Sequence, residues 1–195
     1  MTRFLSRLLI AATALIGAAV HAAEAAPAAT AAAAAAAELE NKLYLDLPAG
    51  RVVIALRPDL APKHVERIKI LVREGFYNGT PFHRVIEGFM AQGGDPTGTG
   101  TGGSKYPNLA AEFTNQAKFL RGTVGAARAM DPNSANSQFY IMFAPASHLD
   151  GQYTIWGRVV SGMEFVDKIK RGAGGNGVVS GPDRIVKMQV AADAK

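Results

Sequence analysis

The segment FHRVIEGFMAQGGDPTGTGTGGSK, Phe82–Lys105, holds the pattern on which the fold assignment depends. Its glycines Gly98, Gly100 and Gly103 satisfy G-x-G-x-x-G, the spacing that holds a dinucleotide pyrophosphate. Gly98 and Gly103 also have the separation of a P-loop, although Ser104-Lys105 reverses the order that this motif requires. Whether these glycines bind a nucleotide therefore depends on the elements on either side of them.

Around this segment the chain consists of short strand patterns and two helical patterns. Lys42–Leu47 and Arg51–Arg57 alternate apolar and polar residues about Pro48-Ala49-Gly50, which predicts an antiparallel hairpin. Apolar residues at helical spacing predict helices over Pro62–Glu74 and Met163–Lys170. Further strands are predicted over Phe82–Ile86, Phe89–Gly93, Thr123–Ala129, Gln138–Phe143, Tyr153–Val160 and Ile185–Ala191. We expect a mainly β fold, a closed eight-stranded antiparallel barrel with a helix near each end, since closure removes exposed sheet edges.

This arrangement disfavours a nucleotide site. A dinucleotide fingerprint needs a strand before the glycines and a helix immediately after them, inside a β-α-β unit. Pro107 follows the glycines closely and disfavours a long helix there. The repeated glycines instead supply the positive φ values of a tight, exposed loop. A nucleotide-dependent enzyme is the weaker interpretation, and a shift of the melting temperature with ATP or NAD would support it.

The N-terminus has the pattern of an export signal. Arg3 and Arg7 precede an apolar run, Leu8–Val20, and the small residues of a cleavage site follow, which predicts a signal peptide over Met1–Ala22. The run is shorter than the roughly 20 residues of a membrane-spanning helix, so an uncleaved anchor is the less favoured alternative. Ala23–Ala37 is almost entirely alanine and is expected to form a tether or a frayed helix. The folded domain is then expected over residues 38–195.

Composition excludes several classes of function. The chain has no cysteine, so we expect neither disulfides nor thiol chemistry. Its net charge of +5 would fall to +3 on loss of Met1–Ala22, and its basic residues are scattered. They form no stripe suited to nucleic acid, so we expect no nucleic-acid partner.

Three segments carry the residues suited to chemistry. In a strand with a bend at Gly88, the side chains of Arg84, Met90 and Gln92 share one face. The segments NSQFYIMF and SHLDGQYTIWGRV add amides and rings to this set: Gln138, Tyr140, Leu149 and Tyr153. Together they describe a shallow apolar dish rimmed by amides and one guanidinium, without a nucleophile beside a base.

These segments resemble the cyclophilin family of peptidyl-prolyl cis-trans isomerases. The resemblance rests on FHRVIEGFMAQGGDPTGTGTGG, DPNSANSQFYIMF and HLDGQYTIWGRVVSGMEFVDKI, which follow in order within about Lys42 to Val190. It implies an eight-stranded barrel capped by two helices, with the active site on its outer surface. The Gly-Thr stretch would then be a loop beside that site, in which glycine serves backbone shape.

The resemblance also implies roles for individual residues. Arg84 corresponds to the catalytic arginine of the family. The residues matched to its substrate-binding groove are Phe89, Met90, Gln92, Ala127, Arg128, Gln138, Tyr140, His148, Leu149 and Tyr153. Phe89, Met90 and Leu149 match the proline pocket, and Gln92 and Gln138 match the groups that hold the peptide backbone.

This chain departs from the family pattern at three of these positions, and its match near Arg128 is loose. Tyr140 stands in place of a phenylalanine, and its hydroxyl must find water or another partner. Tyr153 stands where many members have histidine. His148 replaces a tryptophan that contacts cyclosporin, so we expect weaker inhibition by that drug. Arg128 replaces a backbone-binding asparagine, in a segment that is one residue longer here, so Ala127 and Arg128 are matched only loosely.

The residue types suit isomerisation on chemical grounds. Partial double-bond character opposes rotation about a peptide bond by roughly 18–20 kcal/mol. In the twisted state the prolyl nitrogen regains its lone pair, and a nearby guanidinium can donate a hydrogen bond to it more strongly than in the ground state. An apolar dish anchors the ring while the preceding carbonyl rotates. No metal or cofactor is needed.

Other interpretations of single residues are weaker. His83 and His148 lack a third metal ligand, and the set His148, Asp150 and Ser137 lacks the G-x-S-x-G elbow of a hydrolase triad. The residues assigned to packing are Phe82, Phe139, Ile141 and Trp156.

We therefore expect an exported, periplasmic monomer that isomerises X-Pro bonds in unfolded or partly folded proteins. Once its signal is removed, we expect no stable membrane insertion. The alternative is a binding or chaperone module that uses the same barrel with little isomerase activity.

Overall fold

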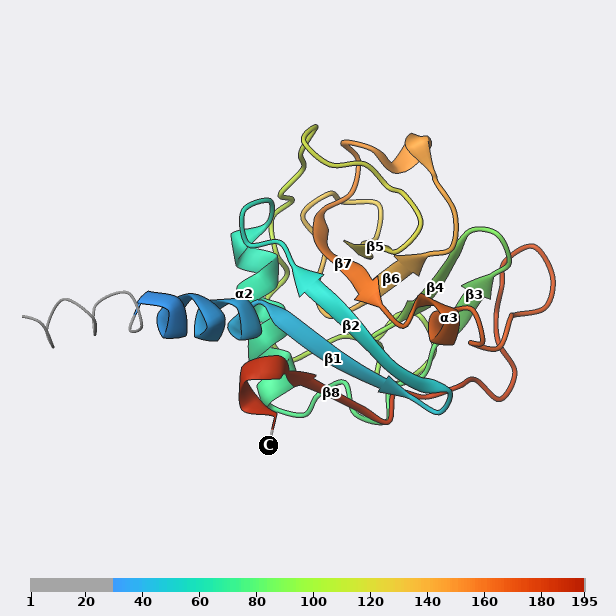
Figure 1. Ribbon diagram of the computed structural model, residues 1–195. Coiled ribbons are helices and arrows are strands. Elements are labelled where there is room, and N and C mark those ends of the chain that lie inside the picture. The colour runs from blue at the N-terminus through green and yellow to red at the C-terminus, as the bar shows by residue number, and fades with distance from the viewer. Residues whose placement is uncertain (1–29, 195) are drawn as a thin grey trace, which may run out of the picture. The chain divides into compact units, whose positions relative to one another are not determined.

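The computed structural model describes residues 30–194 of the chain. The chain divides between Glu38 and Leu39 into two compact units. Residues 30–40 are helical, and residues 30–39 are exposed (Figure 1). The predicted signal peptide, Met1–Ala22, lies outside the described residues. Within residues 30–194, no helix is both long and apolar enough to cross a bilayer.

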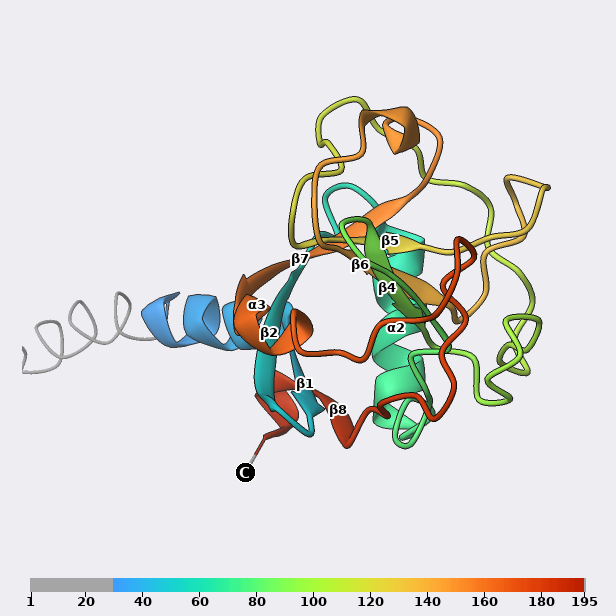
Figure 2. The ribbon, with the colours of Figure 1, turned by 90° about the vertical axis from the view of Figure 1, so that its right-hand side faces the viewer.

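The larger unit is built on one eight-stranded sheet in which every neighbouring pair of strands is antiparallel. The strands are β1 (Lys42–Leu47), β2 (Gly50–Leu56), β3 (Arg84–Ile86), β4 (Met90–Gly93), β5 (Thr123–Ala126), β6 (Phe139–Met142), β7 (Ile155–Ser161) and β8 (Lys187–Val190). Their order across the sheet is β3-β4-β6-β5-β7-β2-β1-β8. The sheet curls round on itself (Figure 2). The mainly β, eight-stranded antiparallel fold predicted from the sequence is confirmed.

The closure of the barrel was predicted wrongly. The two edge strands, β3 and β8, form no ladder with each other in the described part of the chain, so the sheet is a curled half-barrel. The segment between α3 (Met163–Val166) and β8 lies along β3 instead, where the Val85 N–H donates to the Gly177 carbonyl (2.7 Å) and the Gly172 N–H donates to the Val85 carbonyl (2.9 Å). This segment is rich in glycine, which weakens strand structure, and it therefore makes only isolated bridges.

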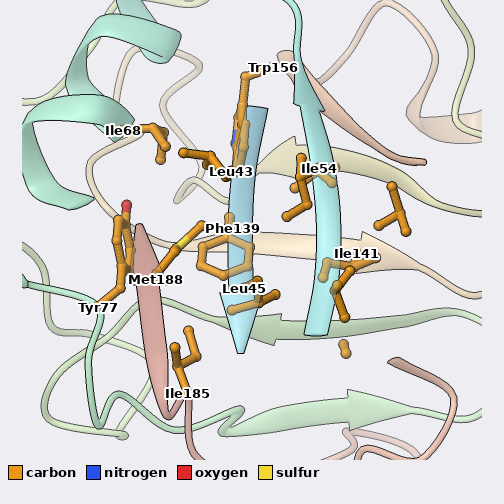
Figure 3. Close-up of a cluster of buried hydrophobic side chains, with 14 of the residues drawn as sticks. Leu43, Leu45, Ile54, Ile68, Tyr77, Phe139, Ile141, Trp156, Ile185 and Met188 are labelled. Atoms are coloured by element: carbon orange, nitrogen blue, oxygen red, sulfur yellow. The ribbon is translucent and has the colours of Figure 1, made fainter. Parts of the chain in front are cut away.

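The interior of the half-barrel is packed with apolar side chains. Burial alternates residue by residue along β1 and β2, because successive side chains of a strand point to opposite faces. Figure 3 shows ten of the side chains that meet there: Leu43, Leu45, Ile54, Ile68, Tyr77, Phe139, Ile141, Trp156, Ile185 and Met188. The four residues assigned to packing, Phe82, Phe139, Ile141 and Trp156, are at most 1% exposed. That prediction is confirmed.

Two helices of the larger unit lie where the sequence pattern placed them. The helix α2 (Pro62–Arg73) begins with Pro62 in its first turn, ends before Gly75 and buries its predicted apolar face against β7 and β8. The helix α3 is shorter than the predicted Met163–Lys170. After Val166, the N–H groups of Lys168 and Ile169 bond to carbonyls three residues earlier, so the chain continues as tighter turns.

Candidate active site

A second cluster of buried apolar side chains covers part of the outer face of the sheet. Its buried members are Leu60, Met90, Phe119, Tyr140, Met142, Ala146, Leu149 and Ile155. On β6, Ile141 belongs to the interior cluster while Tyr140 and Met142 belong to this one. Because neighbouring residues of a strand face opposite ways, one strand supplies both clusters.

A pocket of about 320 Å³ opens over this outer cluster. Its lining residues are Arg84, Phe89, Met90, Gln92, Ala127, Arg128, Tyr140, His148, Leu149 and Tyr153. All ten are among the eleven candidate site residues. The eleventh, Gln138, lines an adjacent pocket of about 540 Å³, which shares Gln92, Ala127 and Arg128 with the first. The structure thus brings together residues that are up to 69 positions apart in the chain.

The hairpin of β3 and β4 places Arg84 at the edge of the first pocket. In its register Arg84 lies opposite Gln92, and Ile86 lies opposite Met90. Gly88 makes the turn with a φ of +69°, a conformation that side chains other than glycine rarely adopt. Arg84, Met90 and Gln92 therefore share one face, as the sequence predicted.

Hydrogen bonds from both sides fix the Arg84 guanidinium. Its Nε donates to the Asn176 carbonyl (2.9 Å), and its Nη1 donates to Gln92 Oε1 (3.2 Å). Both acceptors are neutral, so the positive charge of Arg84 is not offset by them. Asn176 could not be identified from the sequence, because its contact with Arg84 is made by a backbone carbonyl on a distant loop.

A chain of amides links Gln92 to the Gly-Thr loop. Gln92 Nε2 donates to Gln138 Oε1 (2.9 Å). Gln138 Nε2 in turn donates to the carbonyls of Gly100 (3.0 Å) and Gly102 (2.9 Å). The loop therefore sets the orientation of both glutamines, and through Gln92 it steadies the guanidinium.

The Gly-Thr loop is wrapped around the fully buried carboxylate of Asp95. The N–H groups of Gly100 (2.7 Å) and Gly102 (3.1 Å) donate to Asp95 Oδ2, and the N–H and hydroxyl of Thr97 both donate to Oδ1 (2.8 Å each). Burial opposes ionisation of Asp95, but these hydrogen bonds outweigh it and lower the pKa of the carboxyl to about 2. The N–H groups of Gly100 and Gly102 are thus already occupied, which argues against a phosphate site and for a loop held by its own carboxylate.

Tyr140 forms part of the pocket floor. Its ring stacks on Phe119 (centroids 5.8 Å apart) and meets Tyr153 edge-on (6.0 Å). A Cβ on Gly125, its cross-strand neighbour, would come within 2.7 Å of the Tyr140 Cζ and Oη, so glycine makes room for the phenol. The hydroxyl has no partner among the described residues, and burial raises its pKa. Gly125 and Phe119 were not predicted as site residues. Their positions in the sequence do not show that both would face Tyr140.

The remaining wall combines aromatic and cationic side chains. The His148 ring stacks on Phe89 (5.8 Å). The Arg128 guanidinium lies 4.4 Å from the centre of the Tyr153 ring and donates to the carbonyls of Ala129 (2.9 Å), Met130 (3.2 Å) and Gln152 (3.1 Å).

The hydrolase-triad interpretation fails on geometry. Ser137 is buried, and its hydroxyl donates to the Gly94 carbonyl (2.7 Å). Asp150 accepts the Phe119 N–H (2.8 Å) instead of orienting a histidine.

The metal-site interpretation of the histidines is not supported either. Burial of the His83 ring lowers its pKa, and residues 30–194 contain no group of three or more His, Asp or Glu that could hold a metal ion.

The molecule is a half-barrel with an apolar pocket on its outer face and an arginine at the edge of that pocket. These features define a class of protein, and comparison with known families assigns the chain to that class. Residues 42–190 match the family described as cyclophilin type peptidyl-prolyl cis-trans isomerase/CLD. The chain belongs to this family, and it is an enzyme of the cyclophilin type.

Individual relatives agree with this assignment. The chain is 56% identical over 171 residues to a probable peptidyl-prolyl cis-trans isomerase of Brucella suis, covering 82% of this chain and 87% of that one. It is 42% identical over 125 residues to a peptidyl-prolyl cis-trans isomerase of Helicobacter pylori, covering 63% and 76% of the two chains.

Solved structures of cyclophilins show the same architecture. Cyclophilin AquaCyp293 from Hirschia baltica superposes with a TM-score of 0.71 at 28% identity, over 80% of this chain and 76% of that one. A Cryptosporidium parvum cyclophilin-type isomerase, crystallised in the presence of the dipeptide Ala-Pro, gives a TM-score of 0.72 at 28% identity over 76% and 98%.

Proposed function

We propose that this isomerase acts on proline-containing polypeptides outside the cytoplasm and assists the folding of exported proteins. The observation that carries the substrate assignment is the apolar pocket of about 320 Å³ with the Arg84 guanidinium at its edge. The Cryptosporidium parvum relative was crystallised in the presence of Ala-Pro, which supports a proline ring as the occupant of such a pocket. The N-terminal pattern Met1–Ala22 supports export.

In this proposal the proline ring enters the pocket against Phe89, Met90 and Leu149. Burying the ring fixes one side of the X-Pro bond by the hydrophobic effect. Gln92 and Gln138 hold the peptide backbone with their amide groups. Rotation is then confined to the bond before proline, which is the bond that must isomerise.

Arg84 supplies the stabilisation that grows along the reaction. When the peptide bond twists, resonance is lost and the prolyl nitrogen becomes a better acceptor. A guanidinium already held by Asn176 and Gln92 donates to that nitrogen without first reorganising. Because the interaction is weak in the planar ground state, it lowers the barrier instead of merely tightening binding.

The activity is tested by the cis–trans exchange rate of a short Ala-Pro peptide. The protein should accelerate exchange, and Arg84→Ala should lose roughly 10²-fold or more of kcat/KM while remaining folded. The matched control is Arg158→Ala, which removes an exposed arginine from β7 outside both pockets.

The outcomes separate the enzyme from the alternative binding module. Equal acceleration by the parent and by Arg84→Ala would contradict the role of Arg84. No acceleration by either, with peptide binding retained, would make the barrel a binding or chaperone module.

Export is tested by expressing the full chain in a Gram-negative bacterium and fractionating the cells. We expect periplasmic protein that begins near Ala23. Retention of the intact N-terminus in the membrane fraction would favour the uncleaved anchor, and cytoplasmic protein of full length would contradict export.

A further inference from the structure

The two arginines that line the first pocket differ from five of the eight other arginines within residues 30–194. These five form ion pairs with carboxylates: Arg51, Arg57, Arg73, Arg121 and Arg171. Arg67 and Arg184 donate to the backbone carbonyls of Pro107 and Gly79, but neither lines the two pockets. Arg84 and Arg128 hydrogen-bond only to carbonyl and amide oxygens within the described part of the chain. Their charges therefore remain available to a ligand.

The surroundings of Arg128 reinforce its positive charge. Neither pocket has an aspartate or glutamate in its lining, whereas Arg84 and Arg128 both line the first. The Asp95 carboxylate is fully buried and occupied by loop N–H groups, and the exposed carboxylate of Asp131, three residues after Arg128, accepts the Asn133 N–H (2.8 Å). The charged groups that line the two pockets are therefore the guanidinium groups of Arg84 and Arg128.

Arg128 also stands where two parts of a bound peptide would meet, because it lines both pockets. Three of its five N–H groups are used on the carbonyls of Ala129, Met130 and Gln152, and its Cζ lies over the Tyr153 ring, 4.4 Å from the ring centre. Its Nε is buried, which leaves one Nη2 hydrogen and the net charge for a partner. A guanidinium held in this way loses little conformational entropy when it binds a carboxylate.

We propose that Arg128 is a specificity-determining residue that selects peptides with a glutamate or aspartate within two residues of the proline. The inference rests on the proposed function, since it takes the proline ring to occupy the first pocket. In this proposal the residues on one side of the proline run over the wall that the two pockets share, where consecutive Cα atoms about 3.8 Å apart keep them close to Arg128. An acidic side chain at that distance reaches the Arg128 guanidinium.

The experiment compares kcat/KM for peptides that differ only by Glu, Gln or Lys at each of the two positions on either side of proline. At low ionic strength we expect the Glu peptide to exceed the Gln peptide by about threefold to fivefold at one of these positions, and the Lys peptide to be the poorest. Salt should reduce the preference, since exposed charges are screened. A ratio of one at every position would overturn the proposal.

Three variants assign the preference to Arg128. Arg128→Gln should bring the Glu-to-Gln ratio to one, and Arg128→Lys should retain part of it because the charge remains. Arg158→Gln, the control on β7, should keep the full ratio. An unchanged ratio in Arg128→Gln, or its loss in Arg158→Gln, would overturn the proposal.

The readout is a ratio between peptides, so it does not depend on how much activity a variant retains. If a variant is inactive or unstable, calorimetric binding of the Glu and Gln peptides to the parent at low and high salt still decides the charge preference. Failure of the proposed function would look different, since the parent would then not accelerate exchange of any peptide, the neutral ones included.

Discussion

Two loops border the larger of the two pockets, and charged groups of opposite sign hold them. The loop of residues 95–104 turns its N–H groups inward onto the Asp95 carboxylate. The loop of residues 128–136 turns two of its carbonyls onto the Arg128 guanidinium, which also reaches the Gln152 carbonyl. A loop lacks the hydrogen-bond ladder of a sheet, and here a charged side chain takes the place of that ladder. The Asp95 carboxylate accepts from peptide N–H groups, and the Arg128 guanidinium donates to peptide carbonyls.

The difference lies in where the two charges face. Asp95 is fully buried and shares its oxygens among four donors, so its charge serves only the loop. Arg128 is only partly buried and lines both pockets, so its charge serves the loop and also faces the two pockets. The first loop should therefore govern stability and the orientation of Gln138, whereas the second should govern which peptides bind.

The largest effect is expected from Asp95→Ala. It removes the acceptor of four hydrogen bonds, and leaving buried donors unpaired costs about 1–3 kcal/mol for each group that water cannot reach. We expect a loss of about 2–4 kcal/mol in the free energy of unfolding, measured in urea. Asp131→Ala, which removes an exposed carboxylate from the other loop, should cost less than about 1 kcal/mol. Equal losses in the two variants would remove the contrast between the loops.

The pH dependence of stability should follow the carboxylate of the first loop. The pKa of Asp95 is lowered from 3.8 to about 2, so its ionised form favours the folded state. This contribution, about 2 kcal/mol, is complete above the unfolded pKa and is lost as pH falls through the folded one. The advantage of the parent over Asp95→Asn should therefore shrink by about 2 kcal/mol between pH 5 and pH 2. A constant difference would show that the carboxylate is not held as described.

A substitution inside the first loop should act through the same carboxylate. A Cβ on Gly102 would lie 2.1 Å from Asp95 Oδ1, so Gly102→Ala must displace the anchor, at a cost of about 1–2 kcal/mol. Gly175→Ala is the control, because a Cβ there meets nothing within 4 Å. Thermal unfolding of the two variants checks this, and a neutral Gly102→Ala would mean that the loop tolerates another conformation.

The smallest effect on stability is expected from Arg128→Gln. Its three hydrogen bonds go to carbonyls at a partly exposed site, where such bonds contribute little net free energy. We expect a loss of about 1 kcal/mol, constant between pH 3 and pH 8 because a guanidinium stays charged throughout. A loss as large as that of Asp95→Ala would make Arg128 chiefly a structural residue.

The sequence predicted well those parts of the molecule in which apolar and polar residues alternate regularly, or in which the contacting residues are close together in the chain. The strand β1 has the predicted bounds, since its alternation of apolar and polar residues is regular from Lys42 to Leu47. The facing of Arg84 and Gln92 was predictable because one hairpin with a glycine turn contains both. The roles assigned to the pocket residues by resemblance stay predictions, although the structure gathers these residues around adjoining pockets.

What the sequence did not reveal depends on contacts between distant segments. Asn176 holds Arg84 through a backbone carbonyl, which any residue type could supply. The fit of Gly125 beneath Tyr140 depends on the register between two strands. The failure of the barrel to close follows from the glycines near residue 175, whose effect on strand pairing outweighed the general advantage of removing sheet edges.

That incomplete closure leaves β3, the strand that carries Arg84, weakly held along its outer edge. Val85 bonds on its outer side only to Gly172 and Gly177, within a segment whose glycines gain much conformational freedom when released. Local unfolding starts where such contacts are sparse, so the amide protons of Val85 and Val179 should exchange with solvent sooner than that of Ile141, which lies between two paired strands. Each such opening also frees Arg84 Nε from the Asn176 carbonyl. The local stability of the contacts between β3 and the glycine-rich segment therefore sets the fraction of molecules in which the Arg84 guanidinium is held in place at any moment.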